Sequence, residues 1–87
     1  MRYFEAVFER IGDVPVVLQD FPAASGVVMS VPAIVRLLEA FPQIGVIKAE
    51  DFPSPKKISR LRAETTRPVR ILTGNNGQYL VQELERG

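Results

Sequence analysis

Lys48 is the side chain of this sequence with the clearest potential for chemistry, because it ends the apolar stretch I44-G45-V46-I47-K48. A short apolar run of this kind indicates a buried strand. Burial disfavours the charged form of a lysine, and a neutral amine can attack a ketone or aldehyde and form a Schiff base. The alternative is that the strand surfaces at this point, so that Lys48 is solvated and pairs with Glu50 or Asp51. The local pattern by itself favours this second interpretation.

Two more polar side chains, Gln19 and Thr73, end apolar stretches of the same kind, and Gly74 follows directly after the second. In α/β proteins, ligands bind beyond the carboxyl ends of parallel strands. Side chains alternate between the two faces of a strand, so three strands that face the same way would bring Gln19, Lys48 and Thr73 together. We therefore predict a candidate site above one apolar floor at this edge of a sheet.

Other motifs favour structural interpretations. The basic stretch from 56 to 62 is typical of the solvated face of a helix, with an anion or RNA site as the alternative. The sequence G74-N75-N76-G77 could cradle a phosphate or carboxylate before a helix. It lacks the Lys-Ser/Thr of a P-loop, however, so a plain turn is favoured. Glu83 and Glu85 are expected on the surface of the last helix.

The composition excludes several classes of chemistry. The 87 residues contain neither histidine nor cysteine. Imidazole-based catalytic triads, zinc sites built on histidine, thiolate metal sites and disulfides are therefore ruled out for this chain. Acid–base chemistry must use Lys, Tyr, Asp or Glu. The net charge of +1, from 11 basic and 10 acidic residues, predicts no nucleic-acid or membrane partner.

The same composition bounds the compartment and the domain class. The lack of cysteine makes a reducing cytoplasm the expected location. No apolar run approaches the roughly 18 residues that span a bilayer, and charges are threaded through the N-terminal MRYFEAVFERIG, unlike a signal peptide. With 46% hydrophobic residues, the chain fits one globular domain or a piece of one.

The periodicity of apolar residues predicts a helix followed by three strand–helix units. Proline recurs at nearly equal intervals near the start of each strand, at Pro15, Pro42 and Pro68. Ser30 and Ser54 are predicted to cap the second and third helices. The predicted bounds are helix 1–11, strand 14–19, helix 31–41, strand 44–48, helix 55–64, strand 69–73 and helix 77–86, with a loop at 20–26.

Successive units of this spacing favour a parallel sheet with right-handed crossovers. Parallel sheets are normally covered on both faces and have more than three strands, and a three-stranded sheet leaves two unpaired edges. We therefore predict an α/β fold that is part of a TIM (β/α)8 barrel, about three of its eight units, a fold with a full length of about 250 residues. The edges predict a homo-oligomer or association with the missing barrel parts.

Three blocks of the sequence resemble three consecutive blocks of the dihydrodipicolinate synthase/N-acetylneuraminate lyase family, with matching spacing. They are VLQDFPAASG at 17–26, GVIKAED at 45–51 and ILTGNN at 71–76. The resemblance covers nearly the whole chain and implies the segment from the fourth to the seventh helix of the barrel. The family uses a Schiff-base lysine on the sixth strand to bind pyruvate or a related 2-oxo acid, and aldol cleavage or condensation follows. Lys48 occupies the position of that lysine.

The sequence departs from the family at several functional positions. Gln19 stands where the family usually has a tyrosine that relays protons, and an amide cannot do this at neutral pH. Ala24 stands where the dihydrodipicolinate synthases proper have an arginine for a substrate carboxylate, and Asn75 where the residue is often acidic. The family's Thr-Thr-Gly-Glu loop, which grips the oxo-acid carboxylate, has no counterpart. These departures indicate a divergent branch of the family.

The resemblance implies a fragment of a class I (Schiff-base) aldolase or lyase. Lys48 would be its catalytic nucleophile, and Gln19, Thr73, Gly74 and Asn75 would bind a small 2-oxo acid, with no metal and no cofactor. We expect the isolated chain to be inactive, because the carboxylate grip supplies binding energy and orientation that the reaction needs. The alternative is a non-catalytic small α/β module that self-assembles through its exposed sheet edges.

Overall fold

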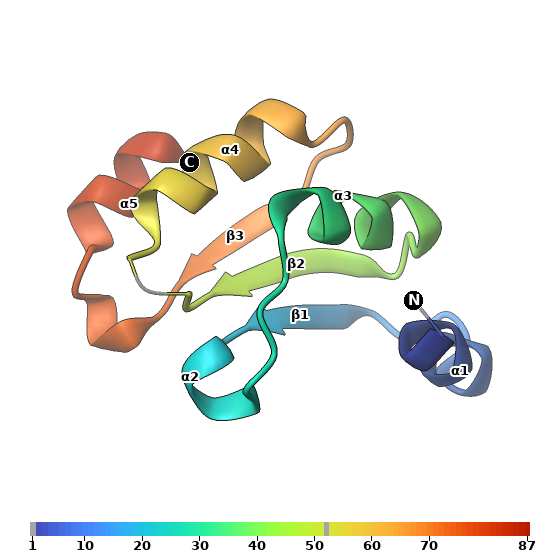
Figure 1. Cartoon of the computed structure of the whole chain (residues 1–87). Coiled ribbons are helices and arrows are strands. Elements are labelled where there is room, and N and C mark those ends of the chain that lie inside the picture. Colours follow the sequence, from blue (N-terminus) through green and yellow to red (C-terminus); the bar gives the residue numbers. More distant parts are fainter. Residues whose placement is uncertain (1, 52) are drawn as a thin grey trace.

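Three parallel strands run through the centre of the molecule, with helices before, between and after them (Figure 1). This computed structural model describes residues 2–51 and 53–87, and of Asn75 the backbone alone. The strands are β1 Val16–Asp20, β2 Ile44–Ala49 and β3 Arg70–Thr73, and they pair in the order β1-β2-β3. The helices are α1 Arg2–Ile11, α2 Pro22–Ser25, α3 Val31–Ala40, α4 Pro55–Glu64 and α5 Leu80–Arg86, with the 3-10 turn η1 Asn75–Gly77.

The first two strands extend one residue further toward their carboxyl ends than predicted. β1 begins at Val16, two positions later than predicted, because Pro15 has no amide hydrogen to donate to the ladder. It ends at Asp20, and β2 ends at the residue after Lys48. Gln19 and Lys48 are therefore the penultimate residues of their strands.

Two helical segments differ from the predicted bounds by more than one residue. Within the predicted loop at 20–26, Pro22 starts the short helix α2, and Gly26 ends it with a left-handed φ of 72°. The amide of Gly26 donates to the Pro22 carbonyl (2.8 Å). α5 begins at Leu80 in place of 77, because Asn76 and Gly77 have φ values of 56° and 71°, which a right-handed helix does not accommodate.

The pairing register decides which side chains share a face of the sheet. Gln19 lies opposite Lys48, and Lys48 lies opposite Leu72. Because side chains alternate along each strand, one face, which we call the open face, carries Val17, Gln19, Val46, Lys48, Arg70 and Leu72. The other face carries Leu18, Asp20, Ile47, Ala49, Ile71 and Thr73.

Helices α3 and α4 cover this second face, and α5 packs beside α4 (Figure 1). Their apolar stripes meet the sheet in one core, whose most buried side chains include Ile34, Leu38, Ile44, Ile47, Ile58 and Leu61. Ser30 caps α3 as predicted, since its hydroxyl accepts a hydrogen bond from the Ala33 amide (3.2 Å). α1 joins the core through Phe8, which stacks on Phe41 with 4.4 Å between ring centroids.

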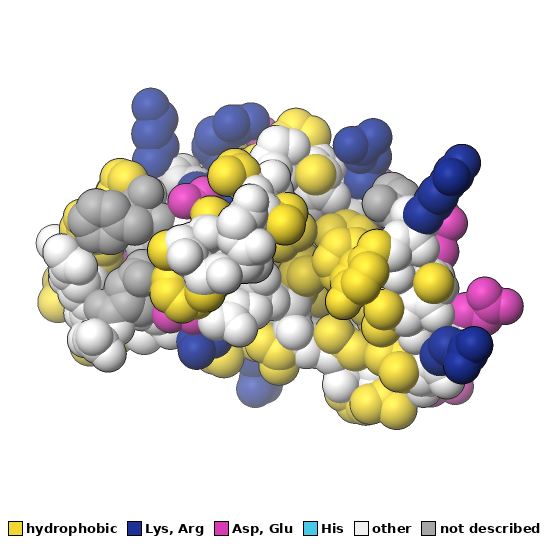
Figure 2. All heavy atoms as spheres, turned by 60° about the horizontal axis from the view of Figure 1, so that its bottom comes forward, with side chains coloured by type: hydrophobic (Ala, Val, Ile, Leu, Met, Phe, Trp, Pro, Cys, Tyr) yellow, Lys and Arg dark blue, Asp and Glu magenta, His cyan; other side chains and the backbone are white. Residues whose placement is uncertain are grey.

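The open face is uncovered within the described part of the chain. Val17 and Leu72, which lie on it, are 54% and 46% exposed. Figure 2 turns the bottom of the view in Figure 1 forward, the side on which β1 lies, and shows hydrophobic side chains gathered there. Within residues 2–51 and 53–87, no further strand pairs with the outer edges of β1 and β3. The face on which Lys48 lies is therefore apolar and accessible.

Candidate active site

Three polar side chains meet on the open face at the carboxyl end of the sheet. The Nζ of Lys48 lies 3.2 Å from Oε1 of Glu50, and Nε2 of Gln19 donates a hydrogen bond to the same oxygen (2.6 Å). The Lys48 side chain is 42% exposed, whereas that of Glu50 is 9% exposed. We call Gln19, Lys48 and Glu50 the amine cluster.

The backbone explains why these three residues meet. Gln19 and Lys48 are register partners on the open face. Glu50 comes two residues after Lys48, so the alternation of β2 directs its side chain to the same side. The Glu50 amide donates to the Asp20 carbonyl (2.9 Å), which continues the pairing of β1 and β2 by one more bond. The cluster is thus held by the ends of two paired strands.

Gly74 lies against the amine cluster from the third strand. A Cβ added to Gly74 would lie 2.0 Å from Cγ of Glu50 and 2.6 Å from its Cδ. Such contacts are far below van der Waals distance, so the Glu50 side chain occupies space that is available because residue 74 is glycine. The observed position of the Glu50 side chain therefore requires a glycine at position 74.

Thr73 is not brought together with Gln19 and Lys48. The register pairs Thr73 with Ala49 and puts Leu72 beside Lys48, so the Thr73 side chain belongs to the opposite face. The expected convergence of three polar side chains is wrong for this reason, because a shift of one residue changes the face. Asn75 begins η1 directly after Gly74. The substrate-binding roles of Thr73 and Asn75 stay predictions.

Glu50 is the residue of the cluster whose role the sequence analysis missed. The sequence pattern suggests Glu50, like Asp51, only as an ion-pair partner of a solvated Lys48. Of these two carboxylates, Glu50 pairs with Lys48, and Asp51 pairs with Lys57. The signal that could have found it is the spacing of two residues from Lys48, which alternation places on one face.

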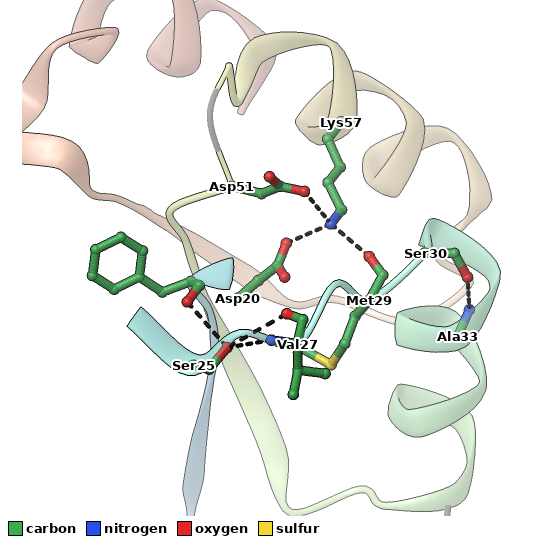
Figure 3. A network of polar contacts seen from close by, with 9 residues as sticks. Asp20, Ser25, Val27, Met29, Ser30, Ala33, Asp51 and Lys57 are labelled. Atoms are coloured by element: carbon green, nitrogen blue, oxygen red, sulfur yellow. Dashed lines mark hydrogen bonds and ion pairs between the residues drawn. The ribbon is translucent and has the colours of Figure 1, made fainter. Parts of the chain in front are cut away.

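A second polar cluster lies behind the sheet, on the side of α4 (Figure 3). The Nζ of Lys57 lies 2.6 Å from Oδ2 of Asp20 and 2.9 Å from Oδ2 of Asp51, and it donates to the Met29 carbonyl (2.6 Å). We call this group the Lys57 clamp. It ties the end of β1, the segment before α3 and the segment after β2 to the first turn of α4.

Burial and the neighbouring charges shift the pKa values of Asp20 and Lys57 in the Lys57 clamp. Asp20 is 1% exposed, and this burial raises the pKa of its carboxyl group more than the neighbouring Lys57 lowers it. Burial also lowers the pKa of Lys57, but hydrogen bonds and charges of Asp20 and Asp51 outweigh it, and the net shift of this pKa is upward. Lys57 thus turns inward, unlike the solvated lysine predicted for the basic stretch.

A groove of about 710 Å³ runs along the free edge of β1 beside α1 and α3. Its lining is mostly apolar and includes Phe4, Val17, Val27 and Met29. Gln19 also lines it, whereas Lys48 does not. Because Gln19 is bonded to Glu50, this amide connects the groove to the amine cluster.

The chain consists of parallel strand–helix units, and an amine lies at the carboxyl end of the central strand. This architecture is that of part of a β/α barrel. Over residues 1–87 the chain matches the Dihydrodipicolinate synthetase family, and it belongs to that family. The predicted family and fold class are thereby confirmed.

A solved structure supports the same assignment. The dihydrodipicolinate synthase from Rhodopseudomonas palustris is similar to this chain with a TM-score of 0.91 and 40% sequence identity. The similarity covers 99% of this chain and 30% of that enzyme, so the chain spans about a third of the enzyme's length. Among curated proteins, a sequence search finds no match.

Two further features concern membranes and metals. Within the described residues, no helix is both long and apolar enough to cross a membrane. The same residues contain no group of three or more His, Cys, Asp or Glu side chains placed to hold a metal ion.

Proposed function

We propose that this chain is a segment of a class I aldolase or lyase that acts on pyruvate or a related 2-oxo acid, with Lys48 as the Schiff-base nucleophile. The observation that supports this most is the position of the Lys48 amine. It lies at the carboxyl end of the central strand, on the open face and next to Gln19, in a chain that belongs to the Dihydrodipicolinate synthetase family.

The chemistry follows from the amine. A neutral Lys48 attacks the carbonyl carbon of the oxo acid, and loss of water leaves an iminium that withdraws electrons from the neighbouring carbon. This electron withdrawal makes cleavage or formation of the adjacent carbon–carbon bond easier. The reaction uses no cofactor and no metal, since the lysine itself supplies the electron sink. Gln19, Gly74 and Asn75, with Thr73 nearby in sequence, would line the oxo-acid site.

The isolated chain should form the Schiff base without completing a catalytic cycle. The residues that grip the substrate carboxylate in the family have no counterpart in 1–87, and losing them removes orientation as well as binding energy. We propose that the open face and sheet edges are covered by further barrel units or by copies of the chain in a cytoplasmic oligomer. Family membership gives no support to the alternative of a non-catalytic module.

Reductive trapping tests the role of Lys48. The chain is incubated with pyruvate, reduced with borohydride and digested, and mass spectrometry locates the adduct. We expect the adduct at Lys48 and not at Lys56, which is an exposed lysine of the same chain. Lys48→Arg should abolish it while keeping the positive charge beside Glu50. A folded chain that is labelled equally at both lysines, or at neither, would contradict the proposal.

A further inference from the structure

Glu50 is a nearly buried carboxylate in direct contact with the amine that the proposed function requires. Its residue is 8% exposed, and its Oε1 lies 3.2 Å from Nζ of Lys48. We propose that Glu50 is the proton-transfer residue for Schiff-base formation at Lys48. This inference rests on the proposed function and assigns a catalytic role to a residue that the family resemblance did not supply.

The distances meet the geometric requirement for proton transfer. A general acid or base must lie within about 2.6–3.2 Å of the atom whose proton it moves. The Lys48 contact is at the outer end of this range, and the Gln19 hydrogen bond to the same oxygen, at 2.6 Å, holds Glu50 in position. Gln19 is thus a positioning residue, because an amide orients the carboxylate but neither takes nor gives up a proton at neutral pH.

Two other carboxylates near the carboxyl ends of the strands are engaged on the opposite face of the sheet. Asp20 and Asp51 both contact Lys57 in the clamp on the far side of the sheet. Tyr3 lies on α1 and is 72% exposed. Within residues 2–51 and 53–87, Glu50 is the acidic side chain that forms an ion pair with Lys48. The position that a tyrosine relay would occupy holds an amide that points to this carboxylate.

The proposed step balances in atoms and charge. The Lys48 ammonium gives a proton to the Glu50 carboxylate, and the neutral amine forms a C–N bond to the carbonyl carbon while the carbonyl π electrons move to oxygen. A proton shift from nitrogen to that oxygen yields the carbinolamine. The Glu50 carboxylic acid then protonates the hydroxyl, the C–O bond breaks, and water leaves. The products are the protonated imine, one water molecule and the regenerated carboxylate.

The rate of Schiff-base formation separates this role from a structural one. Wild type and Glu50→Gln are mixed with pyruvate, quenched with excess borohydride after different times, and the Lys48 adduct is quantified by mass spectrometry. We expect the adduct to form about 100-fold more slowly in Glu50→Gln, since a positioned acid–base group contributes 10²–10⁴ in rate. Glu39→Gln, the same change at an exposed site on α3, should leave the rate unchanged.

Acetylation of Lys48 by acetic anhydride provides the control, because it requires the free amine but no dehydration. In Glu50→Gln the acetylation of Lys48 should be no slower than in wild type, while the imine forms more slowly. Glu50→Asp keeps the carboxylate but withdraws it by one methylene. Its rate of imine formation should lie between those of wild type and Glu50→Gln. This second variant also decides the question if Glu50→Gln does not fold, as judged by far-ultraviolet circular dichroism.

The outcomes distinguish the role of Glu50 from the proposed Schiff-base function of Lys48. A Lys48 adduct that forms at the wild-type rate in the Glu50 variants would overturn the role of Glu50 and leave the proposed function standing. Equal slowing of acetylation and imine formation would also overturn it, because Glu50 would then act on the access or position of Lys48. No Lys48 adduct in folded wild type would overturn the proposed function, and this inference with it.

Discussion

A single carboxylate determines the environment of the Lys48 amine. An exposed lysine beside an exposed carboxylate would gain little from the pair, about 0–1 kcal/mol. Here the Glu50 side chain is 9% exposed and also accepts a hydrogen bond from Gln19. Two side chains, Lys48 and Gln19, therefore hold the carboxylate in position. The sequence suggests this pairing only as part of a solvated lysine, whereas in our proposal the Glu50 carboxylate moves the proton of the amine.

Gly74 allows a direct test of this geometry. In Gly74→Ala the new methyl group would overlap with the Glu50 side chain, so the carboxylate must move away from Lys48. We expect Lys48 adduct formation with pyruvate to slow by about tenfold or more, toward the rate of Glu50→Gln. The borohydride-quench time course measures the effect.

Gly45→Ala is the matched control for Gly74→Ala. Gly45 lies on β2, the strand of Lys48, and a Cβ built there has nothing within 4 Å among the described residues. The rate in this variant should equal that of wild type. If Gly74→Ala and Gly45→Ala behave alike, the packing of Gly74 against Glu50 does not control the amine.

At the scale of the elements, the Lys57 clamp holds segments that carry the site. Asp20 directly follows Gln19 at the end of β1, and Lys57 binds it from the first turn of α4. The same ammonium binds Asp51 after β2 and the Met29 carbonyl before α3. The clamp therefore fixes the carboxyl ends of the two strands that position the amine cluster on the other side of the sheet.

Lys57→Met should destabilise the chain strongly. The change keeps most of the apolar stem but leaves the carboxylate of Asp20, which is 1% exposed, without its cation. Removing one partner of such a buried pair costs about 3 kcal/mol or more. Urea unfolding measures the loss as a lower midpoint.

Lys56→Met is the control for this loss, because it removes a neighbouring lysine that is exposed on the same helix. Its effect should stay within about 0.5 kcal/mol, as for most surface substitutions. Equal midpoints for the two variants would show that the clamp contributes nothing to stability.

Another buried carboxylate, that of Glu83, binds the residue that precedes α4. Ser54 precedes α4 and was predicted to cap it, yet its side chain makes no hydrogen bond to the backbone of the helix. Its hydroxyl bonds instead to Oε1 of Glu83, which is 6% exposed on α5 and not on the surface as expected. The serine therefore joins two helices, since a partner on α5 competes with the local amides.

At the scale of the whole molecule, the chain has a small core and a large uncovered apolar face. A domain of 87 residues buries a modest core and is stable by a few kcal/mol, so single polar contacts matter. The chain spans 30% of the length of a related dihydrodipicolinate synthase. In our proposal, further barrel units or copies of the chain cover the open face and raise its stability by burying it.

The pH dependence of unfolding should report the Asp20 carboxyl group. Burial raises its pKa in the folded chain above the ordinary value of 3.8, so the folded state holds this proton more tightly than the unfolded state. The contribution of Asp20 is therefore fully present below pH 3.8 and is lost as the pH rises through the folded pKa. The pKa of Lys57 is also raised, so its contribution is lost as the pH rises above 10.5.

Asp20→Asn isolates this effect, because other carboxylates titrate alike in both proteins. The free energy of unfolding of wild type minus that of Asp20→Asn should fall as the pH is raised from about 3 to 7. Urea unfolding at several pH values gives the difference. A difference that grows with pH over this range would mean that the folded pKa of Asp20 is lowered, against our expectation.

The sequence by itself determined the order of elements and the position of the key amine. Apolar periodicity defined three strand–helix units, Ser30 marked the start of α3, and Lys48 was expected near the end of β2, where the structure has it. These features depend on residues close together in the chain, so local patterns are sufficient to predict them.

The tertiary structure alone decided which side chains surround the amine. Gln19 and Glu50 are 31 positions apart, and their contact depends on the register of β1 against β2. The register of β3 put Leu72, and not Thr73, beside Lys48. Since a shift of one residue moves every side chain of a strand to the other face, the partners that neighbouring strands supply to the amine follow from strand pairing and cannot be derived from local spacing.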